Sequence, residues 1–256
     1  MVRNIIKKAY ATLVYAFLYL PIFFLILYSF NDSKYRGKWS GFTFKWYKAL
    51  FEDKSIISAV YNTFAVAILA ACIATIKGTI TAIAIYKMSP RMKEIFMNVT
   101  YLPVMNPDIV IGISLLALFG MLKFKLGFIT LLLAHVTFNI PYVILSVLPK
   151  LYQLNPFLEE AALDLGATPL QAFSKVILPE IMPGVITGFL LAFTLSLDDF
   201  MVSFFTTGSG VSTLSIKVYS MTKLGVSPKI NALSTILFIG VLILFILLQK
   251  REENTN

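Results

Sequence analysis

Three aspartates stand inside long apolar stretches of the chain: Asp108, Asp198 and Asp199. A charged side chain costs about 2.5–3.5 kcal/mol at the centre of a membrane helix, so it normally faces water, a cavity or a partner group. Two close carboxylates also repel each other, and a cation relieves that repulsion. These acids therefore favour a positively charged solute, because Lys77 is the only basic residue in the same apolar stretches that can offset one of them.

The two adjacent aspartates point in different directions if they lie on one helix. Neighbours on an α-helix are about 100° apart, so one of Asp198 and Asp199 is expected to face the pathway while the other meets a helix contact or a partner chain. Ser196, just before them, is a further candidate for the pathway. The alternative for each acid is structural, with its carboxylate capping or bridging helices.

Aromatic residues are candidates for completing a cation site, because an ammonium group over an aromatic face gains about 0.5–2 kcal/mol. Trp46 is the preferred residue, at the outer mouth of the pathway, where a solute is delivered. Tyr19 is a second candidate, although packing is the simpler interpretation for it. Tyr86 lies near the end of a predicted span and suits an interfacial anchor.

Nothing in the sequence predicts catalysis or a resident cofactor. His135 is the only histidine, and a lone histidine lacks the neighbours of a metal site or a catalytic triad, so a polar contact between packed helices is preferred. Cys72 is the only cysteine, which excludes an intrachain disulfide. The sequence contains no P-loop, so this chain is not expected to supply ATP chemistry, and any such chemistry is expected from a separate subunit.

The composition places these residues in a membrane protein. Apolar residues make up 58% of the chain and charged residues 14%, and the mean hydropathy is +0.81, values outside the range of soluble domains. Lys and Arg lie between the apolar runs, so the net charge of +9 suits lipid headgroups and loops, not nucleic acid. A spanning helix needs about 20 apolar residues, which predicts an all-α membrane protein with one bundle domain. The predicted spans are 9–30, 57–86, 95–122, 128–148, 184–206 and 230–249.

Six spans place both termini on the same side of the membrane. Arg3 near the start and Arg251 near the end favour the cytoplasm for that side. The loop 31–54 carries several basic residues on the opposite side, so charge bias supports this orientation only in part.

The connection 149–183 is expected to form a pair of short helices on the cytoplasmic face. Asn155, Pro156 and Glu159 make a helix start, with a cap, a proline in the first turn and an acid behind it. This predicts one helix over 156–166 and a second over 169–176. Both are too short to span a membrane, and they suit a grip for a partner protein.

A motif lies in this connection: Glu160, Ala161 and Ala162, then Gly166 six residues after the glutamate, and further on Val176, Ile177, Leu178 and Pro179. Small alanines let a partner surface approach a helix, and a glycine permits a tight turn behind it. The motif resembles the EAA loop of ABC-importer permeases, with one departure at Val176, where the pattern favours isoleucine. The resemblance implies the six-helix type I importer permease fold, with a cytoplasmic coupling helix held in a groove of the ATPase.

Further segments carry a second resemblance: Tyr19-Leu20-Pro21, Ser29-Phe30-Asn31, Lys45-Trp46-Tyr47, 107–110, 195–199, 225–228 and 231–233. They are similar to the permeases of spermidine/putrescine importers, and the resemblance extends over nearly the whole chain. It implies a polyamine importer of the inner membrane, with a pathway formed by this chain and a PotB-like sister permease. A PotA-like ATPase pair would bind at the EAA loop, and a PotD-like periplasmic protein would deliver the solute.

Three alternatives remain open from the sequence. One is a permease of the same family for another solute, such as ferric ion or thiamine. Another is a channel or ion-driven secondary transporter, which needs no ATPase. The third is a membrane enzyme, disfavoured because no catalytic constellation is found.

Overall fold

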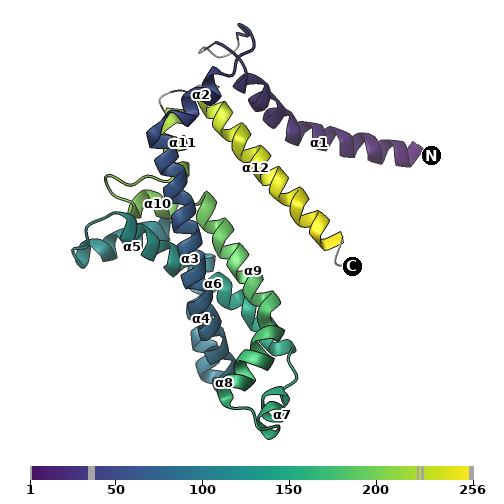
Figure 1. The fold of residues 1–256 in the computed structure, drawn as a ribbon, viewed down its shortest axis with the longest axis vertical. Coiled ribbons are helices and arrows are strands. Elements are labelled where there is room, and N and C mark those ends of the chain that lie inside the picture. Colours follow the sequence, from purple (N-terminus) through teal and green to yellow (C-terminus); the bar gives the residue numbers. More distant parts are fainter. Residues whose placement is uncertain (1, 34–37, 224, 226–227, 254–256) are drawn as a thin grey trace. The chain divides into compact units, whose positions relative to one another are not determined.

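The structure is a computed structural model that describes residues 2–33, 38–223, 225 and 228–253, with side chains described for 7–33, 38–223, 225, 228–240 and 242. Apart from an isolated antiparallel bridge between Asn31 and Phe42, regular structure in these residues is helical (Figure 1). The expected all-α architecture is therefore confirmed. The elements are α1 (Val2–Ser29), α2 (Lys45–Phe51), α3 (Lys54–Lys87), α4 (Pro90–Met105), α5 (Asp108–Met121), α6 (Phe128–Gln153), α7 (Leu158–Asp164), α8 (Pro169–Ala172), the π-helix η1 (Phe173–Ile177), α9 (Leu178–Asp198), α10 (Met201–Thr206), α11 (Leu214–Lys223) and α12 (Pro228–Glu253).

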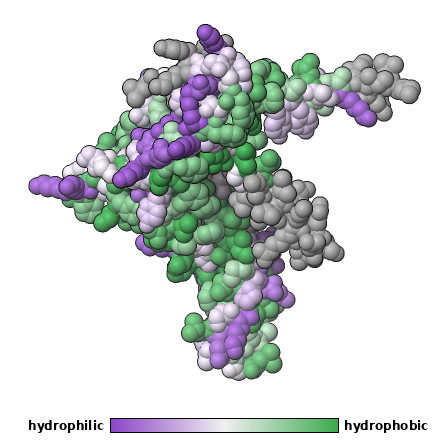
Figure 2. Space-filling view, turned by 45° about the horizontal axis from the view of Figure 1, so that its top comes forward, coloured by the Kyte–Doolittle hydropathy of each residue, from purple (hydrophilic) through white to green (hydrophobic). Residues whose placement is uncertain are grey.

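Several of these helices are long and apolar enough to cross a membrane. The pair α4 and α5 makes one further span if the two bent halves are counted together. Hydrophobic side chains cover much of the visible surface (Figure 2), as expected for a chain that faces lipid and other subunits. The predicted span 230–249 lies on α12, where the side chains of 241 and 243–249 are outside the described part, so the count of six spans and the single domain stay predictions. Among the described residues the four long spans are Lys7–Ser29, Lys54–Lys87, Phe128–Gln153 and Pro169–Asp198.

The predicted span 95–122 is broken in the middle. α4 and α5 meet at an angle of 106°, so the apolar run forms two shorter helices. Pro107 has no backbone N–H and forces the preceding residue out of the helical region. Asn106 is accordingly extended, with φ −83° and ψ 143°. The pair Asn106–Pro107 is a sequence signal for a helix break, and in the structure this break is a sharp turn.

The predicted span 184–206 is also divided. α9 ends at Asp198, Asp199 has extended backbone angles (φ −58°, ψ 128°), and α10 begins at Met201. Both aspartates therefore lie at a helix break and not in the middle of a continuous helix. Broken helices inside a membrane are tolerated where the freed backbone groups line a cavity or are buried in protein.

The chain forms two compact units, 1–57 with 217–256 and 58–216, named unit 1 and unit 2. In unit 1, α1 and α2 pack against α12, and an aromatic cluster joins the end of α1 to the loop that follows it. Phe30 stacks on Phe42 with ring centroids 5.1 Å apart, and Ser29 Oγ lies 2.6 Å from the hydroxyl of Tyr47.

Unit 2 is built around α6, which packs along α9 and also contacts α4, α5 and α10. The close approach of α6 and α9 depends on glycines. A Cβ on Gly184 would lie 2.8 Å from the carbonyl oxygen of Ser146, and one on Gly188 would lie 3.2 Å from Val143 Cα. Gly78 of α3 lies against the same valine, because a Cβ on Gly78 would lie only 2.6 Å from Val143 Cβ. Any larger residue at these positions would push the helices apart.

Candidate functional site

The three aspartates predicted from the sequence line one pocket in unit 2. It has a volume of about 340 Å³ and lies where the breaks α4–α5 and α9–α10 come together. No Lys or Arg is among the residues that line it, so its only formally charged side chains are carboxylates. The lining residues are Asp108, Phe138, Tyr142, Leu195, Asp198, Asp199, Phe200 and Met201.

The helix ends distinguish the three carboxylates. Helix N-termini carry partial positive charge and helix C-termini partial negative charge. Asp108 is the first residue of α5, and Asp199 lies just before α10, so both stand at favourable N-terminal ends. Asp198 is the last residue of α9, where a negative charge is unfavourable. Of the three carboxylates, Asp198 is therefore the one that its own helix end does not stabilise.

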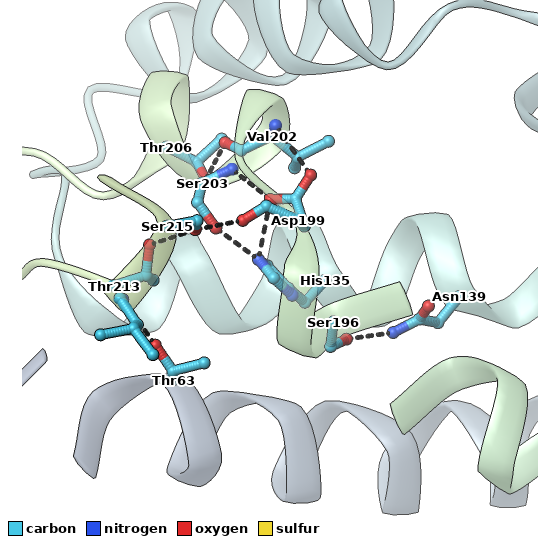
Figure 3. Close-up of polar contacts among 11 residues, drawn as sticks. Thr63, His135, Asn139, Ser196, Asp199, Val202, Ser203, Thr206, Thr213 and Ser215 are labelled. Carbon is cyan, nitrogen blue, oxygen red and sulfur yellow. Dashed lines mark hydrogen bonds and ion pairs between the residues drawn. The ribbon is translucent and has the colours of Figure 1, made fainter. Parts of the chain in front are cut away.

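Asp199 is held by the start of α10 (Figure 3). Its Oδ1 accepts a hydrogen bond from the backbone N–H of Val202 at 3.2 Å, and its Oδ2 accepts one from the N–H of Ser203 at 2.7 Å. Its side chain is 7% exposed, and Oδ2 lies 3.5 Å from His135 Nε2. Its backbone carbonyl accepts a hydrogen bond from Ser215 Oγ at 2.6 Å. Asp199 therefore organises the helix break, as the structural alternative for these acids anticipates.

Asp108 and Asp198 differ from Asp199 in both exposure and partners. Both are exposed in this chain, and among the described residues neither forms an ion pair. Lys77 is exposed and makes no ion pair with any of the three aspartates in the described part, so it does not offset them. The acidic surplus expected from the sequence is present in the pocket.

His135 and Asn139 belong to a buried polar layer behind the pocket. His135 Nε2 lies 3.0 Å from Ser203 Oγ, and Asn139 Nδ2 donates to Ser196 Oγ at 2.7 Å (Figure 3). Ser203 and Asp199 both approach the same nitrogen of His135, whereas a catalytic triad needs them on opposite nitrogens. The arrangement therefore ties α6 to α9 and α10, which agrees with the packing role expected for His135.

Ser196 is a residue of this layer and not of the pocket lining. It is 3% exposed and accepts its hydrogen bond from Asn139. Its predicted place in the pathway stays a prediction.

The two aromatic candidates, Trp46 and Tyr19, belong to unit 1. Trp46 is 9% exposed, and its Nε1 donates to the carbonyl of Asn31 at 2.7 Å. The Nζ of Lys45 lies 4.8 Å from the Trp46 ring centroid, so an internal cation already uses one face of the ring. Tyr19 is 57% exposed and stacks on Tyr15 at 6.5 Å. Their predicted contact with the solute stays a prediction.

Sequence reasoning missed the aromatic residues that lie beside the acids. Phe138 and Tyr142 of α6 and Phe200 in the helix break line the pocket with the aspartates. A signal was present in the spacing, because His135, Asn139 and Tyr142 recur at i, i+4 and i+7 on one face of a helix. This polar stripe on an otherwise apolar helix marked the side that faces the helix breaks.

The backbone of the coupling segment, α7 to η1 (158–177), shows why the motif has a glycine at position 166. Gly166 has φ +84°, and it follows α7 in a Schellman ending, with Gly166 N bonded to Leu163 O at 2.9 Å and Ala167 N to Ala162 O at 3.1 Å. Ala162 is buried, whereas Glu160 and Ala161 are exposed. Exposed apolar side chains surround this turn, with Leu165 90% exposed.

The second half of the coupling segment leads into α9 without a break. Thr168 and Gln171 form a capping box around Pro169. The backbone then passes through η1, where Leu178 N bonds to Phe173 O. This wider turn accommodates Pro179, which has no N–H and would clash with a carbonyl in a regular α-helix. Leu178 is half-buried and Pro179 exposed.

Metal binding has no support among the described residues. No group of three or more His, Cys, Asp or Glu side chains there is placed to hold an ion. The absence of a cofactor stays a prediction.

Comparison with known proteins identifies the family. Residues 74–250 match the family of binding-protein-dependent transport system inner membrane components. The chain is 42% identical to the spermidine/putrescine transport system permease protein PotC of Escherichia coli strain K12, over 100% of this chain and 99% of that one. PotC of Haemophilus influenzae is also 42% identical, over the full length of both chains. The putrescine transport system permease protein PotI of Escherichia coli is 41% identical over 93% of this chain and 87% of the relative.

Solved structures agree on the fold. A bacterial ABC transporter involved in the import of the acidic polysaccharide alginate matches with a TM-score of 0.80, 17% identity and coverage of 97% of this chain and 96% of that chain. The same type of transporter in complex with its alginate pentasaccharide-bound periplasmic protein gives a TM-score of 0.70 and 18% identity, over 96% and 91% of the two chains. The chain has the type I importer permease fold and belongs to the binding-protein-dependent transport system inner membrane components, the non-catalytic permeases of ABC importers.

Proposed function

We propose that this chain forms, with a PotB-like sister permease, the pathway of an ATP-driven importer for spermidine and putrescine. The chain is 42% identical to PotC over its full length, and PotC and PotI are both named as permeases of polyamine transport systems. A PotA-like ATPase pair binds the coupling segment, and a PotD-like periplasmic protein delivers the solute. Both termini then lie in the cytoplasm.

The acidic pocket is the observation that carries the substrate class. A polyamine at neutral pH carries several ammonium groups, each of which donates hydrogen bonds to carboxylates. Asp108 and Asp198 supply these carboxylates, and the end of α9 adds a partial negative charge beside Asp198. Tyr142, Phe138 and Phe200 add aromatic surface for the methylene chain and the ammonium groups.

Asp199 has a different role in this proposal. Its carboxylate is occupied by α10, so it fixes the position of the break while Asp198 meets the solute. This assigns the pathway-facing role to Asp198 and the helix-contact role to Asp199. Trp46, Tyr19 and Ser196 are proposed as further residues of the solute pathway, and the bond from Trp46 Nε1 to the carbonyl of Asn31 supports a role for Trp46 in shaping the outer loop.

The coupling segment connects this pathway to ATP hydrolysis. The exposed tip around Gly166, with Glu160, Ala161 and Leu165, is the surface for the ATPase. α9 follows η1 directly and ends at Asp198, so a displacement of the tip moves the helix that carries the key carboxylate. Alternating access requires such a change in the side to which the site opens.

An uptake assay tests the substrate class. The chain and its partners are expressed in cells without their own polyamine uptake, and import of labelled spermidine is measured against unlabelled competitors. We expect competition by spermidine and putrescine and none by thiamine or ferric ion. Import unaffected by polyamines, or blocked by one of the other solutes, would reject the polyamine assignment while leaving the family intact.

A further inference from the structure

An ion pair links the coupling segment to α3. Lys87 Nζ donates to both carboxylate oxygens of Glu159, each at 2.8 Å. Lys87 is the last residue of α3, and Glu159 lies in the first turn of α7. Each charge therefore also suits its own helix end, since cations favour C-termini and anions N-termini. The pair lies outside the motif residues that carry the family resemblance.

The ion pair stands at the rim of an apolar pocket. This pocket has a volume of about 280 Å³ and lies between the ends of α3 and α6 and the coupling segment. The start of α7 therefore lines this pocket together with the ends of α3 and α6. The hydrogen bonds between Lys87 and Glu159 join α3 to α7 at this pocket. The lining residues are Ile83, Tyr86, Lys87, Leu151, Leu154, Asn155, Pro156, Leu158, Glu159, Pro169, Phe173 and Ile177.

Further contacts stiffen the α3 side of this link. Tyr86, next to Lys87, makes an edge contact with Tyr152 of α6, with ring centroids 5.5 Å apart. Lys93 of α4 lies over both rings, at 4.8 Å from Tyr152 and 5.8 Å from Tyr86. The ends of α3, α4 and α6 are therefore joined into one body at the point where Glu159 is attached.

We propose that Lys87 and Glu159 are positioning residues that transmit movement of the coupling segment to α3 and, through it, to the body formed by α3, α4 and α6. Movement of the coupling segment then reaches the membrane helices by two routes. One runs through η1 into α9, which carries Asp198, and the other runs through the ion pair into α3. This inference rests on the proposed contact between the coupling segment and an ATPase.

Charge reversal tests the link in the complete importer reconstituted in proteoliposomes. The variants are Lys87→Glu, Glu159→Lys and the double variant, with polyamine uptake and ATP hydrolysis measured together and co-purification of the ATPase checked for each. An exposed ion pair has a small coupling energy, so each single reversal is expected to lower the solute imported per ATP by about two- to fivefold. The double variant restores the pair with reversed sign and should recover most of that ratio.

A matched control pair is available in α2, where Lys48 Nζ lies 3.9 Å from Glu52 Oε1 within one helix. The same three reversals there should leave the transport ratio unchanged. The inference is overturned if the Lys87 and Glu159 single variants keep the wild-type ratio, or if the double variant is no better than the worse single one. Loss with Glu159→Lys alone would mean that Glu159 binds the ATPase directly.

A tip variant separates this inference from the proposed function. Leu165→Glu places a charge on the exposed tip and should weaken ATPase binding if the tip is the docking surface. Normal ATPase binding by Leu165→Glu would reject the docking proposal itself. Weakened binding there, together with unchanged ratios in the Lys87 and Glu159 variants, would reject only the ion-pair link.

Discussion

Replacing Asp199 by alanine should lower stability, whereas replacing Asp198 by alanine should not, although the two residues are adjacent. Asp199→Ala removes the acceptor for the N–H groups of Val202 and Ser203. Loss of a helix cap costs about 0.5–2 kcal/mol, and a buried donor left without a partner costs about 1–3 kcal/mol. Since these contributions overlap, we expect a loss of roughly 1–3 kcal/mol.

Asp198→Ala should not lower stability. An acid at a helix C-terminus is unfavourable by about 0.3–1 kcal/mol, so its removal is neutral or slightly stabilising. Asp199→Asn should lie between the two, because asparagine is a good N-cap residue. Each kcal/mol corresponds to about 2–4 °C in a domain of this size.

Thermal unfolding of the purified complex, followed by intrinsic fluorescence, measures the difference. The midpoint should fall by roughly 2–12 °C for Asp199→Ala and stay the same or rise for Asp198→Ala. Equal midpoints for the two variants, or a lower one for Asp198→Ala, would refute the assignment of the helix cap to Asp199.

Three further predictions concern other parts of the chain. Gly78→Ala should reduce the yield of folded protein, because its Cβ would lie 2.6 Å from Val143 Cβ. Gly120→Ala should leave the yield unchanged, since nothing lies within 4 Å of a Cβ there. Size-exclusion profiles of the two variants compare the yields. Gly166→Ala should cost about 1–2 kcal/mol of stability, because position 166 has φ +84°, and it should reduce the solute imported per ATP. Gly166→Asn should have a milder effect on both. The same import per ATP in the two variants would contradict the requirement for a left-handed residue in this turn. Lys229 donates to Asp53 at 2.6 Å and lowers the pKa of Asp53 from 3.8. This pair therefore stabilises the fold above about pH 4 and loses its contribution as the pH falls through the lowered pKa of Asp53. The difference in melting midpoint between wild type and Asp53→Asn should shrink over that pH interval. The change should be small, because both side chains are partly exposed.

The coupling segment could be predicted from sequence because its signals are local. Caps, prolines and a glycine act within a few residues, so the helix expected at 156–166 lies close to the observed α7. The second helix, expected at 169–176, begins at Pro169 but is not a separate short helix, because α8 and η1 continue into α9. The π-helix was not foreseen, because no propensity marks it. It follows from the need to fit Pro179 into a continuous helix.

The pocket could be predicted only in part. The cost of burying a charge singled out Asp108, Asp198 and Asp199, but their meeting depends on two helix breaks far apart in the chain. The expectation that Asp198 and Asp199 point apart rested on a continuous helix, and α9 ends between them. They differ instead because Asp199 caps α10. The aromatic lining from α6 is long-range packing, which helical spacing only indicates.

Transport by Asp198 variants tests the central claim most directly. Labelled spermidine imported per ATP is measured in proteoliposomes for wild type, Asp198→Asn, Asp198→Glu and the exposed control Glu94→Gln on α4. A charged hydrogen bond contributes about 1.5–3 kcal/mol, so Asp198→Asn should transport about tenfold less or worse, with Asp198→Glu partly active and Glu94→Gln normal. Wild-type transport by a fully assembled Asp198→Asn complex would contradict the acidic pocket as the cation site.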